Sequence, residues 1–445
     1  MKKITILLLF TSSTIFAQIV QQELTLSQAI NYALEHKASV QNARWDIKKG
    51  DAEIGEVRAS ALPNIAIDGN TSYNPLLQET VLPGEIVGIP GEDIRVAFGL
   101  KWSSMVNAQL TQTLFNQQVF TGLKAAKSTK EFYILNAELT EEDVIEKVAT
   151  AYYQVFEAKE MLNNVETNIE LAEQALSVIE GLYESGLAKK IDMNRSTVAL
   201  NNIKANRQQL INSLSLSENV LKFMIGMDIN ASIDLAETSF EPTLLPQNET
   251  PLIEQRTELK VLDKQLELLE WQYKATKAEY YPTASLVANY GWLGQGNNFT
   301  LTNGESNGVY WSDLASIGVN IRIPVFSGFG TKNRVQQNKI DIEKAKLNRE
   351  DTRLAFELDH QNALSELENN LITIQNQNEN VQLANTVFSD VQNNYSLGLA
   401  TVNELLDAER ELANAKNNLT KAQLNYKRAE VALLKAQGRL NILSE

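Results

Sequence analysis

The sequence predicts a mainly α-helical chain with a small β part, built from two copies of a helix–strand–strand–long helix–helix unit. Three observations lead to this fold class. The pattern Tyr-x-x-Gly-Leu-Ala occurs at residues 183–188 and again at residues 395–400, 212 positions later. Strictly alternating apolar residues, which are typical of strands, precede each copy of the pattern. Between the strands and the pattern lie long proline-free stretches in which apolar residues recur every seven positions, as in coiled coils.

Other landmarks recur at nearly the same offset, between 211 and 219 residues. The pairs are Pro63 with Pro282, Leu114-Phe115 with Val325-Phe326, and Gly226 with Gly438. Such an offset indicates that about half of the chain was duplicated. We expect a first repeat over residues 18–227 and a second over residues 251–445, joined by a polar linker at residues 228–250.

The composition excludes several classes of function. Lys and Arg are scattered through 445 residues with a net charge of −15, so no nucleic-acid-binding surface is expected. Because cysteine is absent, disulfides, thiolate metal sites, a cysteine nucleophile and a lipidated N-terminal cysteine are excluded. No nucleotide-loop, metalloprotease or serine-hydrolase motif occurs, and we expect neither a cofactor nor enzymatic activity.

Residues 1–17 are expected to be a secretory signal peptide. Lys2 and Lys3 form its charged start, residues 4–10 begin its apolar segment, and Ala17 is a suitable small residue before the cleavage site. The apolar segment is too short to span a membrane as a helix, and no later segment is long and apolar enough. The mature chain is therefore predicted to be exported, and any membrane crossing to use strands.

A helix is expected at the start of each repeat. Thr25 can cap the first helix, with Gln28 at the capping-box position, and this helix should run toward Pro63. In the second repeat, Thr250 and Pro251 should open the equivalent helix.

Four segments alternate apolar and polar residues and are expected to be strands. They lie at about residues 64–74, 96–114, 283–292 and 309–325. One apolar and one polar face suit either a membrane barrel with a wet lumen or a water-facing sheet on a core. The chain offers no broad apolar helix face to cover such a sheet, which favours the barrel. Aromatic residues that could form girdles at the membrane boundaries are Tyr73, Trp102, Tyr290, Trp292, Tyr310 and Trp311.

After each pair of strands the apolar period becomes seven, which predicts long helical hairpins at about residues 116–226 and 327–441. The two seven-residue lines are Val148, Val155, Leu162, Ile169, Leu176 and Tyr183, and Leu367, Ile374, Val381, Phe388 and Tyr395. Leu383, Val387 and Val391 form another narrow line, so each helix should pack between two neighbours. At ~1.5 Å per residue, each long helix would extend about 100 Å.

Each Tyr-x-x-Gly pattern should mark the turn of a helical hairpin. Gly186 and Gly398 can adopt the left-handed conformation that ends a helix, and helical periodicity resumes directly afterwards. Because the two halves are copies, both turns should lie at the same end of the molecule.

With these features assembled, the sequence resembles the TolC-like outer-membrane efflux protein family, the outer membrane factor of tripartite export systems. The resemblance covers nearly the whole mature chain. It is carried by the duplicated order of elements and by three motifs, "IPVFSGFG" at residues 323–330, "NYSLGLATVNELLDAE" at residues 394–409 and "LLKAQGRL" at residues 433–440. It implies a homotrimeric duct in the outer membrane of a Gram-negative bacterium, with a β-barrel and a helical periplasmic tunnel. Such a duct passively conducts drugs, toxins or metals, in efflux or type I secretion, together with an inner-membrane pump and a periplasmic adaptor.

Physical reasoning reaches part of this architecture independently. Four strands cannot close a barrel, and an open edge in lipid leaves backbone groups unpaired. Several copies are needed, since a water-filled lumen takes more than about eight strands. Three copies, the number that the resemblance implies, would close a 12-stranded barrel.

The resemblance also assigns roles at the turns. Three acids would line the closed periplasmic mouth, although acids near a helix start can simply favour the helix dipole. These acids are Asp192, Glu404 and Asp407. Ala400 stands where the family's best-known member has a basic residue, so a latch on that side chain is absent or moved to Lys189 or Lys190. The exposed turn residues would dock the adaptor; this set is Tyr183, Gly186, Leu187, Ala188, Tyr395, Gly398, Leu399 and Ala400.

Two other classes of function fit parts of the pattern. A periplasmic coiled-coil scaffold with a soluble sheet domain would need no aromatic girdles. An outer-membrane barrel enzyme such as a lipase would need a Ser-His pair on the barrel, yet neither His36 nor His360 lies in a predicted strand. His360 falls on the seven-residue line one step before Leu367 and is expected to be a partly exposed packing residue.

Overall fold

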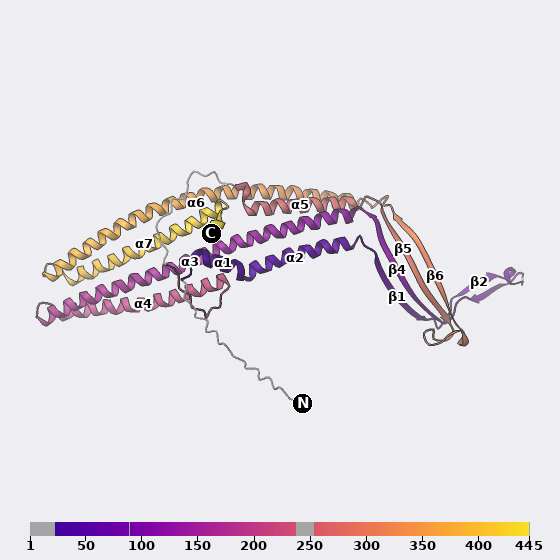
Figure 1. Cartoon of the computed structure of the whole chain (residues 1–445), viewed down its shortest axis with the longest axis horizontal. Helices are drawn as coiled ribbons and strands as arrows, with labels where there is room; N and C mark the ends of the chain where they lie inside the picture. The colour runs from indigo at the N-terminus through magenta and orange to yellow at the C-terminus, as the bar shows by residue number, and fades with distance from the viewer. Residues whose placement is uncertain (1–22, 89, 237–252, 445) are drawn as a thin grey trace, which may run out of the picture. The chain divides into compact units, whose positions relative to one another are not determined.

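The computed structural model describes residues 23–88, 90–236 and 253–444 (Figure 1). The expected signal peptide, most of the linker, and Thr250 with Pro251 lie outside these residues. The chain divides into two compact units. Of the described residues, we call 44–88, 90–136 and 260–351 the strand unit, and 23–43, 137–236, 253–259 and 352–444 the turn unit.

The strand unit contains a four-stranded antiparallel sheet. Its strands are β1 (Asn64–Tyr73), β4 (Trp102–Asn116), β5 (Thr283–Gly296) and β6 (Val309–Arg322), paired in the order β1-β4-β5-β6. The central pair β4–β5 joins the two halves of the chain, with Trp102 opposite Gly296. A 3-10 helix, Glu305–Asn307, lies between β5 and β6. Both outer strands, β1 and β6, have one unpaired edge within this sheet.

A second, smaller hairpin was not predicted. β2 (Glu79–Pro83) pairs with β3 (Asp93–Ala97), with a 3-10 helix at Gly84–Val87 between them. The strand predicted at residues 96–114 is therefore wrong at its start, because residues 96–97 belong to β3 and β4 begins only at Trp102. The extended path is interrupted at Gly99, whose φ is +128°, a conformation that favours glycine.

The strand register assigns each side chain to one face of the sheet, because directly paired residues share a face. The apolar face carries Ile65, Ile67, Leu110, Leu286, Ile317, Val319 and Ile321. The opposite face carries Asn70, Asn107, Gln109, Asn289, Ser316 and Asn320. The apolar face is open in the single chain, where Ile317 is 81% exposed.

Helices of the strand unit are most of α2 (Ala38–Ala59) and α5 (Thr257–Ala278), and the first parts of α3 (Gln117–Glu184) and α6 (Gly330–Ser396). Ion pairs connect them. Lys264 Nζ of α5 lies 2.7 Å from Glu131 Oε2 of α3, and Arg349 Nε of α6 lies 2.8 Å from Asp263 Oδ1 of α5. These pairs are partly exposed, so we expect each to stabilise the unit only slightly.

The turn unit contains α1 (Leu26–His36), α4 (Lys190–Ile225), α7 (Val402–Ala436) and the later parts of α3 and α6. Two 3-10 helices, Ile253–Gln255 and Leu440–Ser444, also belong to it. The predicted capping box of Thr25 and Gln28 at the start of α1 is confirmed. The single helix expected from there toward Pro63 is wrong, because extended backbone at Lys37 separates α1 from α2. The Lys37 ammonium donates to the Phe223 carbonyl oxygen at 2.5 Å, so the residue at the break between α1 and α2 contacts the end of α4.

The seven-residue lines are buried in part. In α6 the line is confirmed at Leu367, Ile374, Phe388 and Tyr395, which are at most 9% exposed. In α3 the predicted line is buried at Val148 and Val155 but reaches the surface at Tyr183. The buried positions there are instead Val165, Ala172 and Ile179, as expected when a straight helix drifts relative to a seven-residue repeat.

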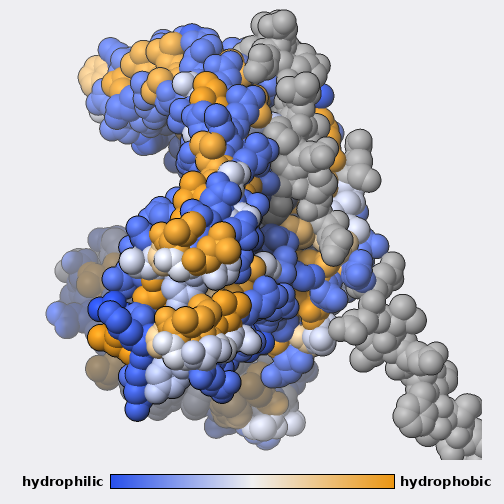
Figure 2. All heavy atoms as spheres, turned by 90° about the vertical axis from the view of Figure 1, so that its left-hand side faces the viewer, coloured by the Kyte–Doolittle hydropathy of each residue, from blue (hydrophilic) through white to orange (hydrophobic). Residues whose placement is uncertain are grey.

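Apolar residues off these seams stay on the surface of the single chain. Leu383 and Val387 of α6 are 58% and 53% exposed. Figure 2, which is viewed from the side of the α3–α4 and α6–α7 turns, shows hydrophobic residues at the surface among hydrophilic ones. Leu383 and Val387 of the predicted second packing line are therefore exposed in the single chain, whereas its third member, Val391, is partly buried against the cluster around Phe388.

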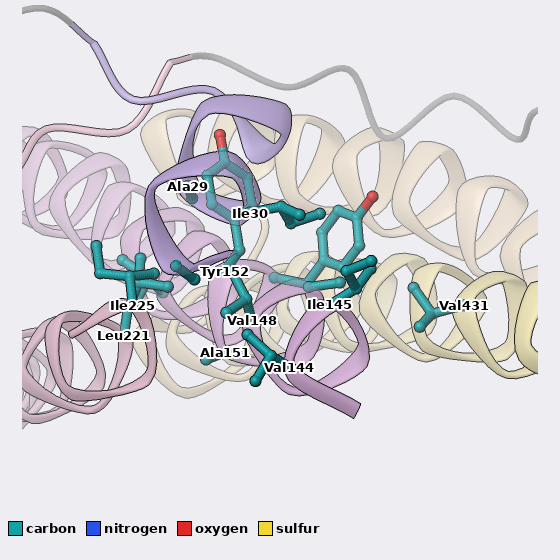
Figure 3. Packing of buried hydrophobic residues seen from close by; sticks show 14 of the residues in the cluster. Ala29, Ile30, Val144, Ile145, Val148, Ala151, Tyr152, Leu221, Ile225 and Val431 are labelled. Carbon is teal, nitrogen blue, oxygen red and sulfur yellow. The ribbon is translucent and has the colours of Figure 1, made fainter. Parts of the chain in front are cut away.

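The main core of the turn unit lies where five helices meet. Buried residues from α1, the start of α2, α3, α4 and α7 converge there, among them Ile30, Tyr152, Leu221 and Val431 (Figure 3). Tyr152 is fully buried and its hydroxyl donates to the Leu24 carbonyl oxygen at 3.0 Å, so its polar atom is satisfied. Among the described residues, no helix combines the length and the apolar character needed to cross a membrane.

Candidate functional site

The two helical turns have the same backbone structure. Gly186 and Gly398 have φ of +75° and +73°, which confirms the predicted left-handed conformation. The Gly186 amide donates to the Tyr183 carbonyl oxygen at 2.9 Å, and the Leu187 amide donates to the Leu182 carbonyl oxygen at 2.8 Å. These paired bonds form a Schellman motif, which satisfies carbonyl groups left open at a helix end.

The second turn repeats this motif. The Gly398 amide donates to the Tyr395 carbonyl oxygen at 3.0 Å, and the Leu399 amide donates to the Asn394 carbonyl oxygen at 2.8 Å. In both turns the residue after glycine leaves the helix with its side chain in solvent, Leu187 at 79% and Leu399 at 76% exposure.

A shared core holds the two turns together. Ile179 of α3, Phe388 and Tyr395 of α6, and Leu405 and Leu412 of α7 form one buried cluster. The prediction that both turns lie at the same end of the molecule is therefore confirmed within the turn unit.

The two tyrosines of the repeated pattern have different surroundings. Tyr183 is 38% exposed, whereas Tyr395 is 9% exposed. Burial, and secondly the negative charge of Asp192, raises the pKa of the Tyr395 hydroxyl. Asp192, at the start of α4, thus lies close enough to the second turn to influence it.

A groove of about 770 Å³ separates the two turns. Leu187, Ile191 and Arg195 line it from the first turn, and Leu397 and Asn403 line it from the second. The Arg195 guanidinium Nη1 donates to Asn403 Oδ1 at 3.0 Å across this groove. The groove therefore combines exposed leucines with a polar bridge, and it is open to a partner.

Two of the acidic residues at the turns, Glu404 and Asp407, have partners at the start of α7. The Thr401 amide donates to Glu404 Oε2 at 2.6 Å and the Glu404 amide donates to Thr401 Oγ1 at 3.3 Å, a capping box at the start of α7. The backbone amide of Thr401, and then its hydroxyl, lowers the pKa of Glu404. Asp407 Oδ1 accepts from Arg410 Nη2 at 2.9 Å. No group of three acids or histidines among the described residues is placed to hold a metal ion.

The remaining turn residues differ between the copies. Lys189 is the N-cap residue of α4 but makes no side-chain capping bond, in contrast to Thr401. Ala400 packs against the shared core, whereas Ala188 and Lys190 lie at the first turn outside it. The two turns are therefore alike in backbone but unlike in the side-chain capping of the helix that follows.

Glu409 of α7 is a buried acid that sequence reasoning missed. It is 4% exposed, and its Oε1 atom has no hydrogen-bond partner among the described residues. Burial raises the pKa of Glu409 to about 7. A signal was present: Glu409 follows Val402 by seven residues, and Val402 belongs to the buried cluster.

The predicted aromatic residues divide between the two faces of the sheet. Tyr73 is paired with Trp102, and their ring centroids are 4.7 Å apart; Tyr290 and Trp292 make a second contact of 4.7 Å. These four and Trp311 share the apolar face. Tyr310 is paired with Gln295 and lies on the opposite, polar face.

Both histidines lie on helices, His36 in α1 and His360 in α6. The His36 ring stacks on Tyr32 at a centroid distance of 4.0 Å. His360 was expected to be partly exposed but is 6% exposed, because the buried seven-residue line of α6 extends from Leu367 back to His360.

Comparison with known proteins decides the relationship. The sequence profile of the outer membrane efflux protein family matches residues 29–227 and 251–439. The chain belongs to this family. It is thus an outer-membrane channel component of efflux and type I secretion systems, the function that the resemblance implied.

Relatives agree over most of the chain. The Bordetella pertussis protein CyaE is 23% identical over 75% of this chain and 67% of its own length. The outer membrane protein TolC of Escherichia coli is 22% identical over 93% of this chain and 82% of its own length. The solved structure of the outer membrane protein VceC of Vibrio cholerae has a TM-score of 0.69 at 18% identity, covering 93% of this chain and 96% of its own.

Proposed function

We propose that three copies of this chain form a duct through the outer membrane of a Gram-negative bacterium. In this assembly, the sheets of the strand units close a 12-stranded barrel, and the long helices form a periplasmic tunnel. Substrates pass through it after delivery by an inner-membrane pump and a periplasmic adaptor. The observation that carries the proposal is a four-stranded sheet with unpaired edges and one apolar face.

The sheet geometry supports closure between copies. An unpaired strand edge in lipid would leave its amide and carbonyl groups without partners. Pairing β6 of one copy with β1 of the next satisfies both edges and repeats by rotation. Members of this family form trimers and work with adaptor and pump components, which supports the number three and the partners.

The two faces suit the two surroundings of such a barrel. Ile317, Val319 and Ile321 would face lipid, and Asn289, Ser316 and Asn320 would face a water-filled lumen. A water-facing sheet would leave Ile317, at 81% exposure, in solvent at a cost of about 25 cal/mol per Å² of apolar surface. This contrast favours the channel over the periplasmic scaffold.

Cysteine cross-linking tests the closure, since the chain contains no cysteine of its own. We would combine Asn70→Cys on the polar face of β1 with single cysteines scanned along β6. Disulfide-linked trimers that survive denaturing electrophoresis are expected at alternate positions of β6. Gln109→Cys on the central strand β4 is the matched control and should give none. Trimers without any β1–β6 cross-link would contradict the barrel.

The turns are the proposed docking surface for the adaptor. Leu187 and Leu399 are exposed beside the groove between the turns, and such apolar residues often mark partner sites. Leu187→Asp with Leu399→Asp should abolish export while outer-membrane trimers form in normal amount. Leu76→Asp, at a residue that is 89% exposed in the strand unit, should leave export unchanged. Normal export by correctly inserted double variants would exclude this docking surface.

Asp192, Glu404 and Asp407 are proposed to line the closed mouth of the duct. Copies of these acids around one axis would repel one another within the ~8 Å Debye length at physiological salt, and they would attract cations. We expect a cation-selective resting conductance in planar bilayers that multivalent cations block from the turn side.

Neutral variants can separate this role from helix capping. Glu404→Gln removes the charge but keeps the capping box, because either Glu or Gln can occupy its third helical position. Asp407→Asn removes the charge and keeps the shape of the side chain. The double variant should lose part of its cation selectivity and block, whereas Glu411→Gln on the exposed surface of α7 should not. Unchanged selectivity in the double variant would show that these acids serve only the helix start.

A further inference from the structure

A cationic and aromatic groove lies in the strand unit, between the start of α3 and the end of α5. Its volume is about 370 Å³, within the usual range for small-molecule sites. Its main lining residues are Phe120, Lys124, Trp271, Lys274, Lys277 and Tyr281. Three ammonium groups therefore face one groove in a chain whose net charge is −15.

The positive charge of this groove is poorly compensated. Lys274 Nζ is 4.0 Å from Glu270 Oε2, the limit for an ion pair. Within the described residues, no carboxylate lies at ion-pair distance from Lys124 or Lys277. The ammonium groups of Lys274 and Lys124 lie 4.1 Å and 5.6 Å from the Trp271 ring centroid, so the indole is their common neighbour.

Other acids near the end of α5 are engaged elsewhere. Glu267 accepts from Lys264 Nζ at 2.6 Å and from Trp271 Nε1 at 3.1 Å. Glu279 accepts from Arg334 and, at 3.2 Å, from Thr331 of α6. Among the described residues, an external anion at the groove would therefore meet three cations, of which Lys274 alone has a carboxylate, that of Glu270, at the limit of ion-pair distance.

The groove continues the apolar face of the sheet. The Phe120 ring centroid lies 6.4 Å from that of Phe115, and Phe115 is paired with Ala284 on the apolar face. β4 ends at Asn116 and β5 begins at Thr283, so the groove adjoins the helix-side ends of the two central strands. If the apolar face contacts lipid acyl chains, the groove lies at the level of the lipid headgroups.

We infer that this groove binds the headgroup phosphate of an anionic glycerophospholipid in the leaflet nearest the helices. The inference rests on the proposed function, because it requires the strands to cross the outer membrane. Lys124, Lys274 and Lys277 contact the phosphate, while their stems and the rings of Phe120 and Tyr281 contact the upper acyl chain. Trp271 holds two of the ammonium groups at the boundary.

The test measures lipid preference in bilayers. Full-length trimers are placed in phosphatidylcholine nanodiscs that contain a trace of spin-labelled phosphatidylglycerol or spin-labelled phosphatidylcholine. Electron paramagnetic resonance then gives the relative association of each lipid with the protein. Because each basic residue near an anionic surface changes binding about fivefold, we expect the preference for phosphatidylglycerol to fall at least tenfold in Lys124→Gln/Lys274→Gln/Lys277→Gln.

A matched triple variant controls for net charge. Lys260→Gln/Lys339→Gln/Lys344→Gln removes three exposed lysines of the same unit outside the groove and should retain the preference. An equal loss in both variants, or no preference in the unchanged protein, would overturn the inference. Displacement of the labelled lipid by millimolar inorganic phosphate would identify a site for free anions instead.

Insertion is read separately from lipid preference. Heat-modifiable trimers in the nanodiscs establish that the strands are in a bilayer. If no variant and no unchanged protein inserts, the proposed function fails; if all insert without the expected difference, only the lipid site fails.

Discussion

The buried acid Glu409 leads to a prediction about how the stability of α7 depends on pH. Its folded-state pKa of about 7 lies above its ordinary value of 4.5, because burial disfavours the carboxylate. The folded state therefore binds the proton more tightly than the unfolded state does. The stability of α7 should fall as the pH rises from about 4.5 to about 7 and remain constant above that.

The rise in pKa from 4.5 to about 7 corresponds to roughly 3 kcal/mol. Glu409→Gln removes the ionisation while keeping the size of the side chain. Hydrogen exchange followed by mass spectrometry measures the local opening of α7 in both proteins at each pH, so the intrinsic exchange rate cancels in their ratio. Above pH 7, the variant should be protected up to about two orders of magnitude more than the unchanged protein.

The pH dependence of this ratio is the decisive result. Below pH 4.5 both side chains are neutral, so protection should be nearly equal. Glu411→Gln, on the exposed side of the same helix, should give a ratio near one throughout. A protection ratio for Glu409→Gln that does not change with pH would refute the idea that burial raises the pKa of Glu409 and so destabilises α7. Infrared spectroscopy of the carboxyl band offers an independent check of the Glu409 pKa.

Two further predictions concern the turns and are read by hydrogen exchange of the turn peptides. Gly398→Ala should destabilise the second turn by about 1 kcal/mol, since its φ of +73° is costly for other residues, whereas Gly181→Ala inside α3 should be neutral or stabilising. Equal effects at both glycines would contradict this reasoning. Thr401→Ala should weaken the start of α7 by about 1 kcal/mol, whereas Lys189→Ala should change α4 little because Lys189 makes no capping bond; a comparable loss at Lys189 would show that the capping bond is not the cause.

Features governed by local chemistry could be predicted from the sequence. The capping box at Thr25 depends on residues three positions apart, and the left-handed glycines of the turns depend on a few neighbours. The alternating segments placed three strands well for the same reason. Each of these features is decided within a few residues, so a single sequence contains enough information.

Features that depend on distant packing could not be predicted in this way. The break at Lys37 arises where the end of α4 packs, and a Cβ at Gly226 would lie 3.1 Å from the His36 carbonyl oxygen. The short β2–β3 hairpin was hidden because Phe98 and Leu100 continue the alternation of the next strand across Gly99. Burial of Glu409 needs α7 to be seated in the shared core, which its charge alone would argue against.

The unburied apolar residues show what kind of structure the sequence describes. The seam of α6 through Leu367 and Phe388 is satisfied inside one chain, whereas Leu383 and Val387 on the same helix are not. The same division holds in the sheet, where β4 and β5 pair along their length apart from a register shift between Thr113 and Phe115, but each outer strand has a free edge. A chain that evolved to fold alone would gain from polar residues at these positions, because an apolar side chain stabilises the fold only when it is removed from water. In the proposed assembly, these residues would contact neighbouring copies along the helices, and lipid or a neighbouring strand at the sheet. The seven-residue lines and the alternating strands therefore predict contacts between copies as well as the fold of one chain. Cross-linking between copies tests these contacts along the helices and at the sheet edges.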